Sequence, residues 1–145
     1  MRQFDRSLPM ALLKAREAVM RKFTPHLREH GLSAQQWRVL RALVESGALD
    51  ATEIAKRCAL LMPSLSRILQ NLERRDLIVR VAEQADLRRS LVSLTPAGIA
   101  LFEKIAPQSE ERYRHITEKF GYGKLELLYE LLDELVEKLE DDAAA

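Results

Sequence analysis

Residues 50–74 contain two short amphipathic segments with only a tight connection between them. Asp50 and Glu53 stand three residues apart ahead of an apolar run, which is the spacing of a capping box, so a helix is expected to begin there. That helix lasts barely two turns before the apolar connection at 59–61. Pro63 then opens a second helix, because a proline at the first helical position loses only a donor that has no helical acceptor. The segment therefore predicts two short helices on a tight turn.

The second of these helices separates apolar from polar side chains. At helical spacing, its apolar face consists of Leu65, Ile68, Leu69 and Leu72. The opposite face, called the outer face below, consists of Pro63, Arg67, Gln70 and Arg74, and is flanked by Ser64, Ser66 and Asn71. The outer face is polar and basic.

Two alternating runs rich in β-branched residues follow, at 77–82 and 90–94. The residues between them, 83–89, are polar enough for a solvated loop. The pattern predicts a β-hairpin with Arg88 and Arg89 at its tip.

Long helical patterns precede this segment. Apolar residues at three- and four-residue steps predict a first helix from Ser7 until Gly31 ends it. Ser33 and Gln36 form another capping box, ahead of a second helix that runs to about Ser46.

Helical patterns also follow the hairpin. A helix is expected over residues 95–120, with Pro107 as a kink, and the glycines of 121–123 break it. Leucines at steps of three and four along 125–139 predict a last helix. This leucine stripe suits either packing within the chain or a seam against a second copy.

Composition is consistent with one mainly helical domain. The chain has 145 residues, 47% of them hydrophobic, with only 5 Gly and 5 Pro. The N-terminus lacks the continuous apolar core of a signal peptide, and no stretch approaches the roughly 18 apolar residues of a spanning helix. A cytoplasmic protein is therefore expected.

The net charge of +1 hides an uneven distribution. Residues 1–49 carry nine Lys and Arg against four Asp and Glu, and residues 50–94 carry eight against six. Residues 121–145 carry two against eight. A polyanionic partner is therefore expected to meet the N-terminal two-thirds of the chain.

A short helix, a tight turn, a second helix with a basic outer face and an arginine-tipped hairpin together suit duplex DNA. In the major groove, Arg67 would pair with guanine and Gln70 with adenine. Ser64 and Ser66 near the helix N-terminus are candidates for phosphate contact. At the hairpin, Arg88 or Arg89 suits the minor groove, with Asp86 as an ionic brace. Taken singly, each feature also fits an ordinary solvated surface.

The sequence resembles the MarR family of regulators over nearly its whole length. The matching stretches are Thr-Glu-Ile-Ala at 52–55, Pro-Ser-Leu-Ser-Arg-Ile-Leu-Gln-Asn-Leu-Glu at 63–73, Asp-Leu-Arg-Arg at 86–89 and Leu-Thr-Pro-Ala-Gly at 94–98. Residues 11–20 and 31–40 are similar to one branch, the repressors of homoprotocatechuate (4-hydroxyphenylacetate) degradation operons. Ala59 departs from the pattern, since many family members have Gly in the turn.

The resemblance implies a mostly α (α+β) fold, a winged helix-turn-helix with N- and C-terminal dimerisation helices. Residues 1–145 would form a single domain, with 1–32 and 95–145 as dimerisation helices and 33–94 as the winged lobe. The homodimer would then present two lobes to a pseudo-palindromic operator in double-stranded DNA, with half-sites ~34 Å apart.

The resemblance also implies a small aromatic acid effector, in this branch a phenolic acid such as 4-hydroxyphenylacetate or homoprotocatechuate. Its carboxylate needs a cation and its ring needs an apolar or aromatic wall. The candidate residues are Ser7, Met10, Leu13, Arg16, Trp37 and Arg38. The alternative is that Trp37 belongs to the core and that the two arginines form surface ion pairs.

No metal, cofactor or catalytic set emerges from the sequence. His26 and His30 are four residues apart but have no third ligand nearby, and Cys58 lies at an apolar helix position where inert burial is expected. An operator-binding repressor released by an aromatic acid is the leading hypothesis. The alternatives are a winged-helix regulator that responds to another signal, a winged-helix protein-interaction module and, more distantly, a small enzyme.

Overall fold

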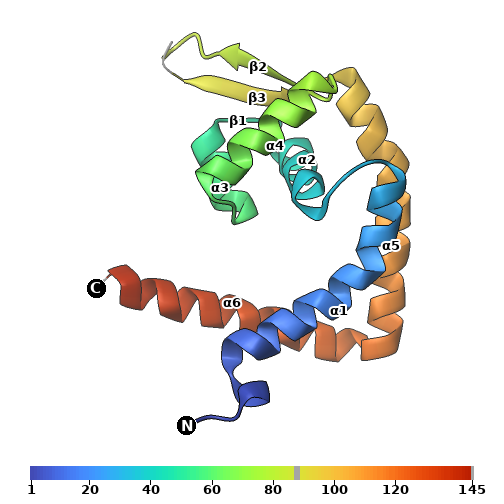
Figure 1. The fold of residues 1–145 in the computed structure, drawn as a ribbon, viewed down its shortest axis with the longest axis vertical. Coiled ribbons are helices and arrows are strands. Elements are labelled where there is room, and N and C mark those ends of the chain that lie inside the picture. The colour runs from blue at the N-terminus through green and yellow to red at the C-terminus, as the bar shows by residue number, and fades with distance from the viewer. Residues whose placement is uncertain (87–88, 145) are drawn as a thin grey trace. The chain divides into compact units, whose positions relative to one another are not determined.

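The computed structural model describes residues 1–86 and 89–144 (Figure 1). In chain order the elements are η1 (Phe4–Arg6), α1 (Leu8–Glu29), α2 (Ala34–Ser46), β1 (Ala48–Leu49), α3 (Ala51–Cys58), α4 (Met62–Arg74), β2 (Ile78–Ala82), β3 (Ser90–Leu94), α5 (Pro96–Phe120) and α6 (Tyr122–Ala144). The predicted helices and the predicted hairpin are confirmed, and so is the mostly α fold class.

The two predicted capping boxes both form. The Ser33 hydroxyl accepts a hydrogen bond from the Gln36 amide at 3.1 Å, and the Gln36 side chain accepts one from the Ser33 amide at 2.9 Å. At the start of α3, the Asp50 carboxylate accepts from the Glu53 amide at 2.8 Å, and Glu53 Oε1 accepts from the Asp50 amide at 3.1 Å. Each box satisfies donors that the first helical turn leaves without a partner, so both helices begin where the sequence predicts.

Strand β1 and the short helix η1 are the elements that sequence reasoning missed. The sheet has the order β1-β3-β2, with both pairs antiparallel. Ala48 is paired with Ser93 and Leu49 with Val92, whereas β2 and β3 pair over their full length from Ile78–Leu94 to Ala82–Ser90. Two residues are too few for an alternating pattern, and only the neighbouring strand makes them a strand.

The chain divides into two compact units, Met1–Gln108 and Ser109–Ala145, and the boundary falls within α5. The helix continues through Pro107, next to that boundary. The first unit holds α1, the helix-turn-helix and the sheet, and the second holds the end of α5 and all of α6. The assignment of residues 1–145 to a single domain stays a prediction.

The core of the first unit collects one apolar face from each surrounding element. Its most completely buried side chains are Leu27, Val39, Leu40, Leu43, Ile54, Leu65, Leu69, Leu72, Ile78, Val92 and Ile105. They come from α1, α2, α3, α4, both strands of the hairpin and α5. Three of the four predicted apolar residues of α4 are buried, and Ile68 packs partly buried against them.

Among the described residues, no helix is long and apolar enough to cross a membrane.

Gly98 sits where the start of α5 meets the chain that links α4 to β2. A Cβ at Gly98 would lie 2.1 Å from the backbone oxygen of Leu77. The same oxygen accepts a hydrogen bond from the Thr95 amide at 3.1 Å, so the two backbones are held close together.

Gly98→Ala is therefore expected to lower the free energy of unfolding by about 2 kcal/mol, because a backbone must move to make room for the methyl group. Gly123→Ala is the matched control, since nothing lies within 4 Å of a Cβ there. This control should be neutral or slightly stabilising, because Ala favours helix over Gly. Urea denaturation of both variants measures the difference, and equal stabilities would contradict the packing described here.

Candidate nucleic-acid interface

Helix α4 turns its apolar face inward and its outer face toward solvent. Leu65, Leu69 and Leu72 are at most 1% exposed. The exposed residues of the helix include Pro63, Ser66, Arg67, Gln70 and Arg74, whereas Ser64 and Asn71 are partly buried. The basic face predicted to contact DNA is therefore exposed, so another molecule can reach it.

The N-terminus of α4 begins one residue earlier than expected. Met62 is the first helical residue, so Pro63 occupies the second position, where its missing amide also leaves no helical acceptor unsatisfied. The N-cap is Leu61, which has no side-chain acceptor. The first amides of α4 thus remain available for water or a phosphate oxygen.

The turn between α3 and α4 depends on Ala59. Its backbone adopts φ 54° and ψ 51°, the left-handed region that glycine occupies most readily. The turn is closed by a hydrogen bond from the Leu60 amide to the Ala55 oxygen at 2.9 Å. An alanine therefore takes the left-handed turn conformation that a glycine would adopt there.

Asn71, predicted to contact DNA, is engaged inside the lobe. Gln36 Nε2 donates a hydrogen bond to Asn71 Oδ1 at 2.8 Å, and the same Gln36 side chain belongs to the α2 capping box. This bond occupies one acceptor site of the Asn71 oxygen and fixes the direction of its side chain. Its present contact instead fixes α4 against α2.

Arg75 is a functional candidate that sequence reasoning missed. It follows the last residue of α4, and its guanidinium donates to the Gly31 oxygen at 2.8 Å and to the His30 oxygen at 3.2 Å. These carbonyls lie at the end of α1, the negative end of the helix dipole. Arg75 therefore ties the end of α4 to the end of α1. No local pattern pairs residues 44 positions apart.

Strands β2 and β3 form the hairpin that we call the wing. The Glu83 amide donates to the Arg89 oxygen at 2.9 Å, which closes the wing just beyond its strands. Leu87 and Arg88 lie outside the described residues, so the predicted contact of Arg88 and its bracing by Asp86 stay predictions. Asp86 itself is exposed.

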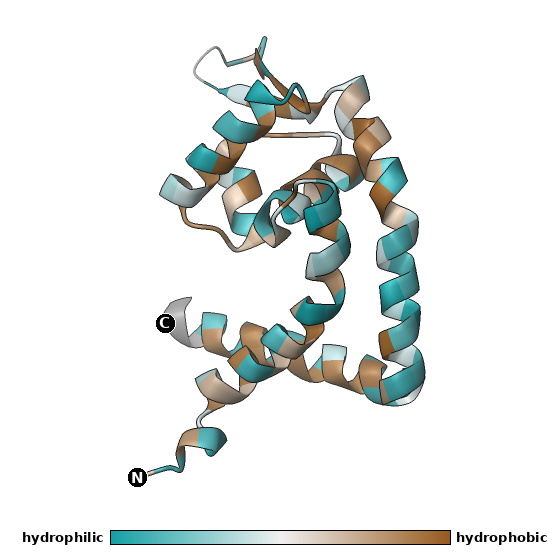
Figure 2. Cartoon of the chain, turned by 45° about the vertical axis from the view of Figure 1, so that its right-hand side comes forward, coloured by the Kyte–Doolittle hydropathy of each residue, from teal (hydrophilic) through white to brown (hydrophobic). Residues whose placement is uncertain are grey.

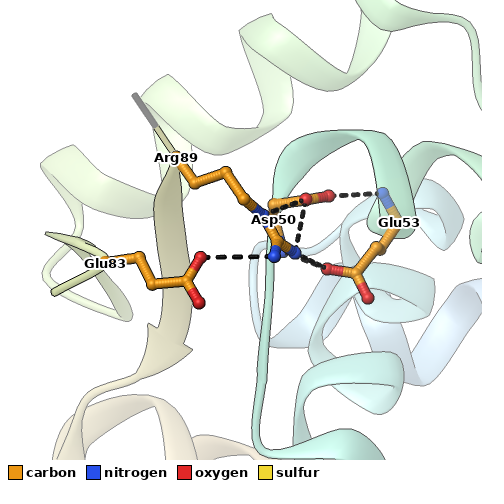
Figure 3. A network of polar contacts seen from close by, with 4 residues as sticks. All are labelled: Asp50, Glu53, Glu83 and Arg89. Atoms are coloured by element: carbon orange, nitrogen blue, oxygen red, sulfur yellow. Dashed lines mark hydrogen bonds and ion pairs between the residues drawn. The ribbon is translucent and has the colours of Figure 1, made fainter. Parts of the chain in front are cut away.

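Arg89 lies at the base of the wing loop, and its guanidinium faces three carboxylates (Figure 3). They belong to Asp50, Glu53 and Glu83. The hydrogen bond to Asp50 and the negative charge of Glu83 raise the pKa of Arg89. The Glu53 amide holds the pKa of Asp50 below its usual value, and the bond from Arg89 lowers it further. Both shifts favour the charged forms.

Two of the six residues predicted for the effector are enclosed by the first unit. Trp37 is 7% exposed, and its ring stacks on Phe102 with centroids 5.1 Å apart and planes 15° apart. It belongs to the core, as the alternative interpretation expects. Arg38 is partly buried, and its Nη1 donates to the Cys58 oxygen at 2.7 Å.

Arg16 and Arg38 come close enough for their charges to interact. Burial lowers the pKa of Arg38, and the like charge of Arg16 lowers it further. Arg16 is exposed and lies 3.7 Å from Glu17 across its ion pair. The first unit thus brings together two of the predicted cations, one from α1 and one from α2.

The remaining predicted effector residues lie along the start of α1. Ser7 and Met10 are partly buried, and Leu13 is exposed. Ser7 lines a cavity with η1 and the first turn of α1, while Arg38 lines a separate cleft of about 160 Å³ together with Arg41 and Cys58. These two cavities share no residue.

Cys58 is buried, as the sequence predicts. The Cys58 thiol is buried, burial raises its pKa, and its Sγ contacts the Arg38 oxygen at 3.5 Å. His30 Nε2 lies 3.1 Å from Gln108 Oε1. In the described part of the chain, no three His, Cys, Asp or Glu side chains gather as metal ligands would.

A helix-turn-helix with an exposed basic face, followed directly by a hairpin, defines a winged-helix DNA-binding protein. The comparisons with known proteins agree. A model of the MarR family matches residues 30–89. The chain is 42% identical to the HTH-type transcriptional regulator FarR of Neisseria gonorrhoeae, over 93% of this chain and 92% of that protein. It is also 42% identical to the homoprotocatechuate degradative operon repressor of Escherichia coli, over 90% and 88%.

Solved structures are similar over almost the whole chain. NadR in complex with 4-hydroxyphenylacetate superimposes with a TM-score of 0.82 at 40% identity, covering 93% of this chain and 98% of that one. The repressor CouR, bound to a 23-mer DNA duplex, superimposes with a TM-score of 0.83 at 26% identity, covering 94% and 98%. This chain belongs to the MarR family and is a DNA-binding transcriptional regulator; the relatives named here are regulators, not enzymes.

Arg74→Gln is expected to weaken binding to duplex DNA and to make the slope of log K against log salt shallower by about 1.8 for a dimer, because each of the two protomers loses one phosphate contact worth about 0.9. Arg67→Gln should relax base preference at one position per half-site. Lys138→Gln, an exposed position on the acidic last helix, is the matched control. Fluorescence anisotropy across a salt series measures all three, and an unchanged slope for Arg74→Gln would remove that residue from the interface.

Proposed function

We propose that this protein is a homodimeric repressor of an aromatic-acid catabolic operon, and that a phenolic acid such as 4-hydroxyphenylacetate or homoprotocatechuate releases it from its operator. The observation that carries the proposal is the 40% identity, over 93% of this chain, to NadR in complex with 4-hydroxyphenylacetate. Arg16 of α1 and Arg38 of α2 are the cations predicted for the carboxylate, and the positive charge of Arg16 lowers the pKa of Arg38. Two guanidinium groups in this position repel one another, and a carboxylate between them removes the repulsion.

The relatives support the chemical class of the effector. NadR binds 4-hydroxyphenylacetate, and the E. coli relative represses a homoprotocatechuate degradative operon. Both compounds join a phenolic ring to a carboxylate. Arg38 and the exposed Arg41, which line one cleft, supply cations to such a group. A repressor of this kind works where the operator is, in the cytoplasm of a bacterial cell.

A homodimer accounts for apolar surface that the chain leaves uncovered. Leu8, Leu12 and Val19 on α1 are 52%, 40% and 42% exposed, although Phe23 and Leu27 on the same stripe are buried. On α6 the exposed apolar residues are Leu127, Leu128, Leu131, Val136 and Leu139. Apolar residues recur along both helices in Figure 2. Faces of this extent are covered in a stable protein, and a second copy offers a matching pair.

Contacts inside the first unit connect the proposed effector site to α4. A carboxylate between Arg16 and Arg38 draws α1 and α2 together. Helix α2 is tied to α4 through Gln36 and Asn71, and α1 is tied to it through Arg75. A ligand that favours one arrangement of these helices therefore favours one placement of the two α4 helices, and DNA binding weakens by linkage.

Saturating 4-hydroxyphenylacetate is expected to raise Tm by roughly 5 °C and to dissociate the protein from its operator, because the ligand binds the folded, DNA-free form. Arg16→Ala should lose most of this shift, whereas Arg28→Ala, an exposed arginine further along α1, should keep it. The amide 4-hydroxyphenylacetamide lacks the negative charge and should have little effect. Equal shifts for acid and amide would remove the arginine pair from the site.

Leu131→Arg is expected to shift the protein from dimer toward monomer, because a charge at an exposed apolar position of α6 would be desolvated at the seam. Lys138→Gln again serves as the control on the same helix. Sedimentation equilibrium reads the mass directly. A monomeric wild-type protein at micromolar concentration would contradict the proposed dimer.

A further inference from the structure

The contacts of Arg89 join the wing to the first turn of α3. Its Nε donates to Asp50 Oδ2 at 2.9 Å, and its Nη2 lies 2.7 Å from the same oxygen. Nη2 also donates to Glu53 Oε1 at 2.8 Å. Nη1 lies 3.2 Å from Glu83 Oε2. All three guanidinium nitrogens therefore face carboxylate oxygens, and these carboxylates come from two different elements of the lobe (Figure 3).

Two of these carboxylates already have a structural task. Asp50 and Glu53 form the capping box of α3, and each accepts a backbone amide of the other. Their positions are thus fixed by the start of the helix. Glu83 stands immediately after β2, and its amide donates to the Arg89 oxygen across the wing. One guanidinium consequently connects the closed end of the strand pair to the N-terminus of α3.

The Glu83 carboxylate makes it unfavourable for the Arg89 side chain to leave its ion pairs. Its Oε2 is shielded from solvent and forms no hydrogen bond of normal alignment, so Arg89 at 3.2 Å compensates its charge through the ion pair. If Arg89 swung out to a phosphate, three carboxylates would stay behind without this cation and beside a polyanion. Like charges so placed repel both each other and the DNA.

We propose that Arg89 is a positioning residue: it latches the wing to the N-terminus of α3 and so sets where the wing stands relative to the outer face of α4, instead of contacting phosphate itself. The sequence had marked Arg89 as a DNA contact because of its place beside the hairpin tip. This proposal rests on the proposed DNA-binding function, because the role of the latch is to place the wing on the duplex.

Charge and fork geometry together distinguish a latch from a phosphate contact. A phosphate accepts the point charge of a Lys ammonium, so a direct contact responds mainly to the loss of charge in Arg89→Met, although a bidentate phosphate contact also uses the Arg fork. Three carboxylates in different directions need the planar fork, which an ammonium group does not supply. Arg80 is a matched control within the wing. Among the described residues its guanidinium pairs only with Glu73, at 3.7 Å, and does not join several carboxylates.

The experiment uses the whole protein and a duplex that the wild type has selected from a randomised library. Arg89→Lys and Arg89→Met are both expected to weaken binding about tenfold, whereas Arg80→Lys stays within about twofold of the wild type. In the free protein, the Glu83 amide should exchange faster with solvent in both Arg89 variants, and the carboxyl pKa of Asp50 should rise. Glu83→Gln, which leaves the capping box intact, should speed the same exchange to a smaller extent.

Two results would overturn the latch. One is an Arg89→Lys variant that binds like the wild type while Arg89→Met loses affinity with a slope shallower by about 1.8 per dimer, which is the behaviour of one direct phosphate contact in each protomer. The other is unchanged amide exchange in the free protein. Arg67→Gln and Arg74→Gln in the same assay test the DNA interface separately. If they bind normally, that interface fails, while the exchange measurement still decides whether Arg89 holds the wing.

Discussion

The burial of Leu65, Leu69 and Leu72 is the constraint on which the rest of this structure depends. These three side chains are almost completely removed from solvent and join leucines of α2 and residues of the sheet in one core. Because a helix has fixed angular spacing, burying them turns Arg67, Gln70 and Arg74 outward. The same residues that stabilise the lobe by the hydrophobic effect therefore also aim its DNA-reading surface.

Polar contacts fix that surface within the first unit. The residues that cap α2 and α3 also bond to a second element of the lobe. Gln36 completes the capping box of α2 and also holds Asn71 of α4. Asp50 and Glu53 complete the capping box of α3 and also hold Arg89 of the wing. Exposed ion pairs add little to stability individually. Their value here is geometric, because each fixes an element of the lobe to a helix end whose position is already determined.

The helices and the hairpin could be predicted because each has a local cause. The capping boxes at Ser33 and Asp50 lie within four residues of chain, and the apolar face of α4 follows from spacing alone. DNA binding was also predictable, because a basic outer face next to a hairpin suits duplex DNA and the same residues resemble the MarR family. The roles of Asn71, Arg75 and Arg89 were not predictable in this way. Asn71 is 35 positions from its partner Gln36, Arg75 is 44 from Gly31, and Arg89 is 39 from Asp50. No local pattern relates residues so far apart in the sequence.

The sequence by itself determined where helices begin and which of their faces are apolar, because these properties depend on neighbouring residues and on fixed periodicities. Its motif stretches, such as residues 63–73, also carried the resemblance to the MarR family. The tertiary structure alone decided which charged side chains form ion pairs within the lobe and which stand on the exposed outer face of α4. Arg67 and Arg89 are chemically the same residue, but only folding brings three carboxylates to one of them. The tertiary structure also placed Trp37 in the core. Its ring stacks on Phe102, a residue of α5 more than sixty positions later in the sequence.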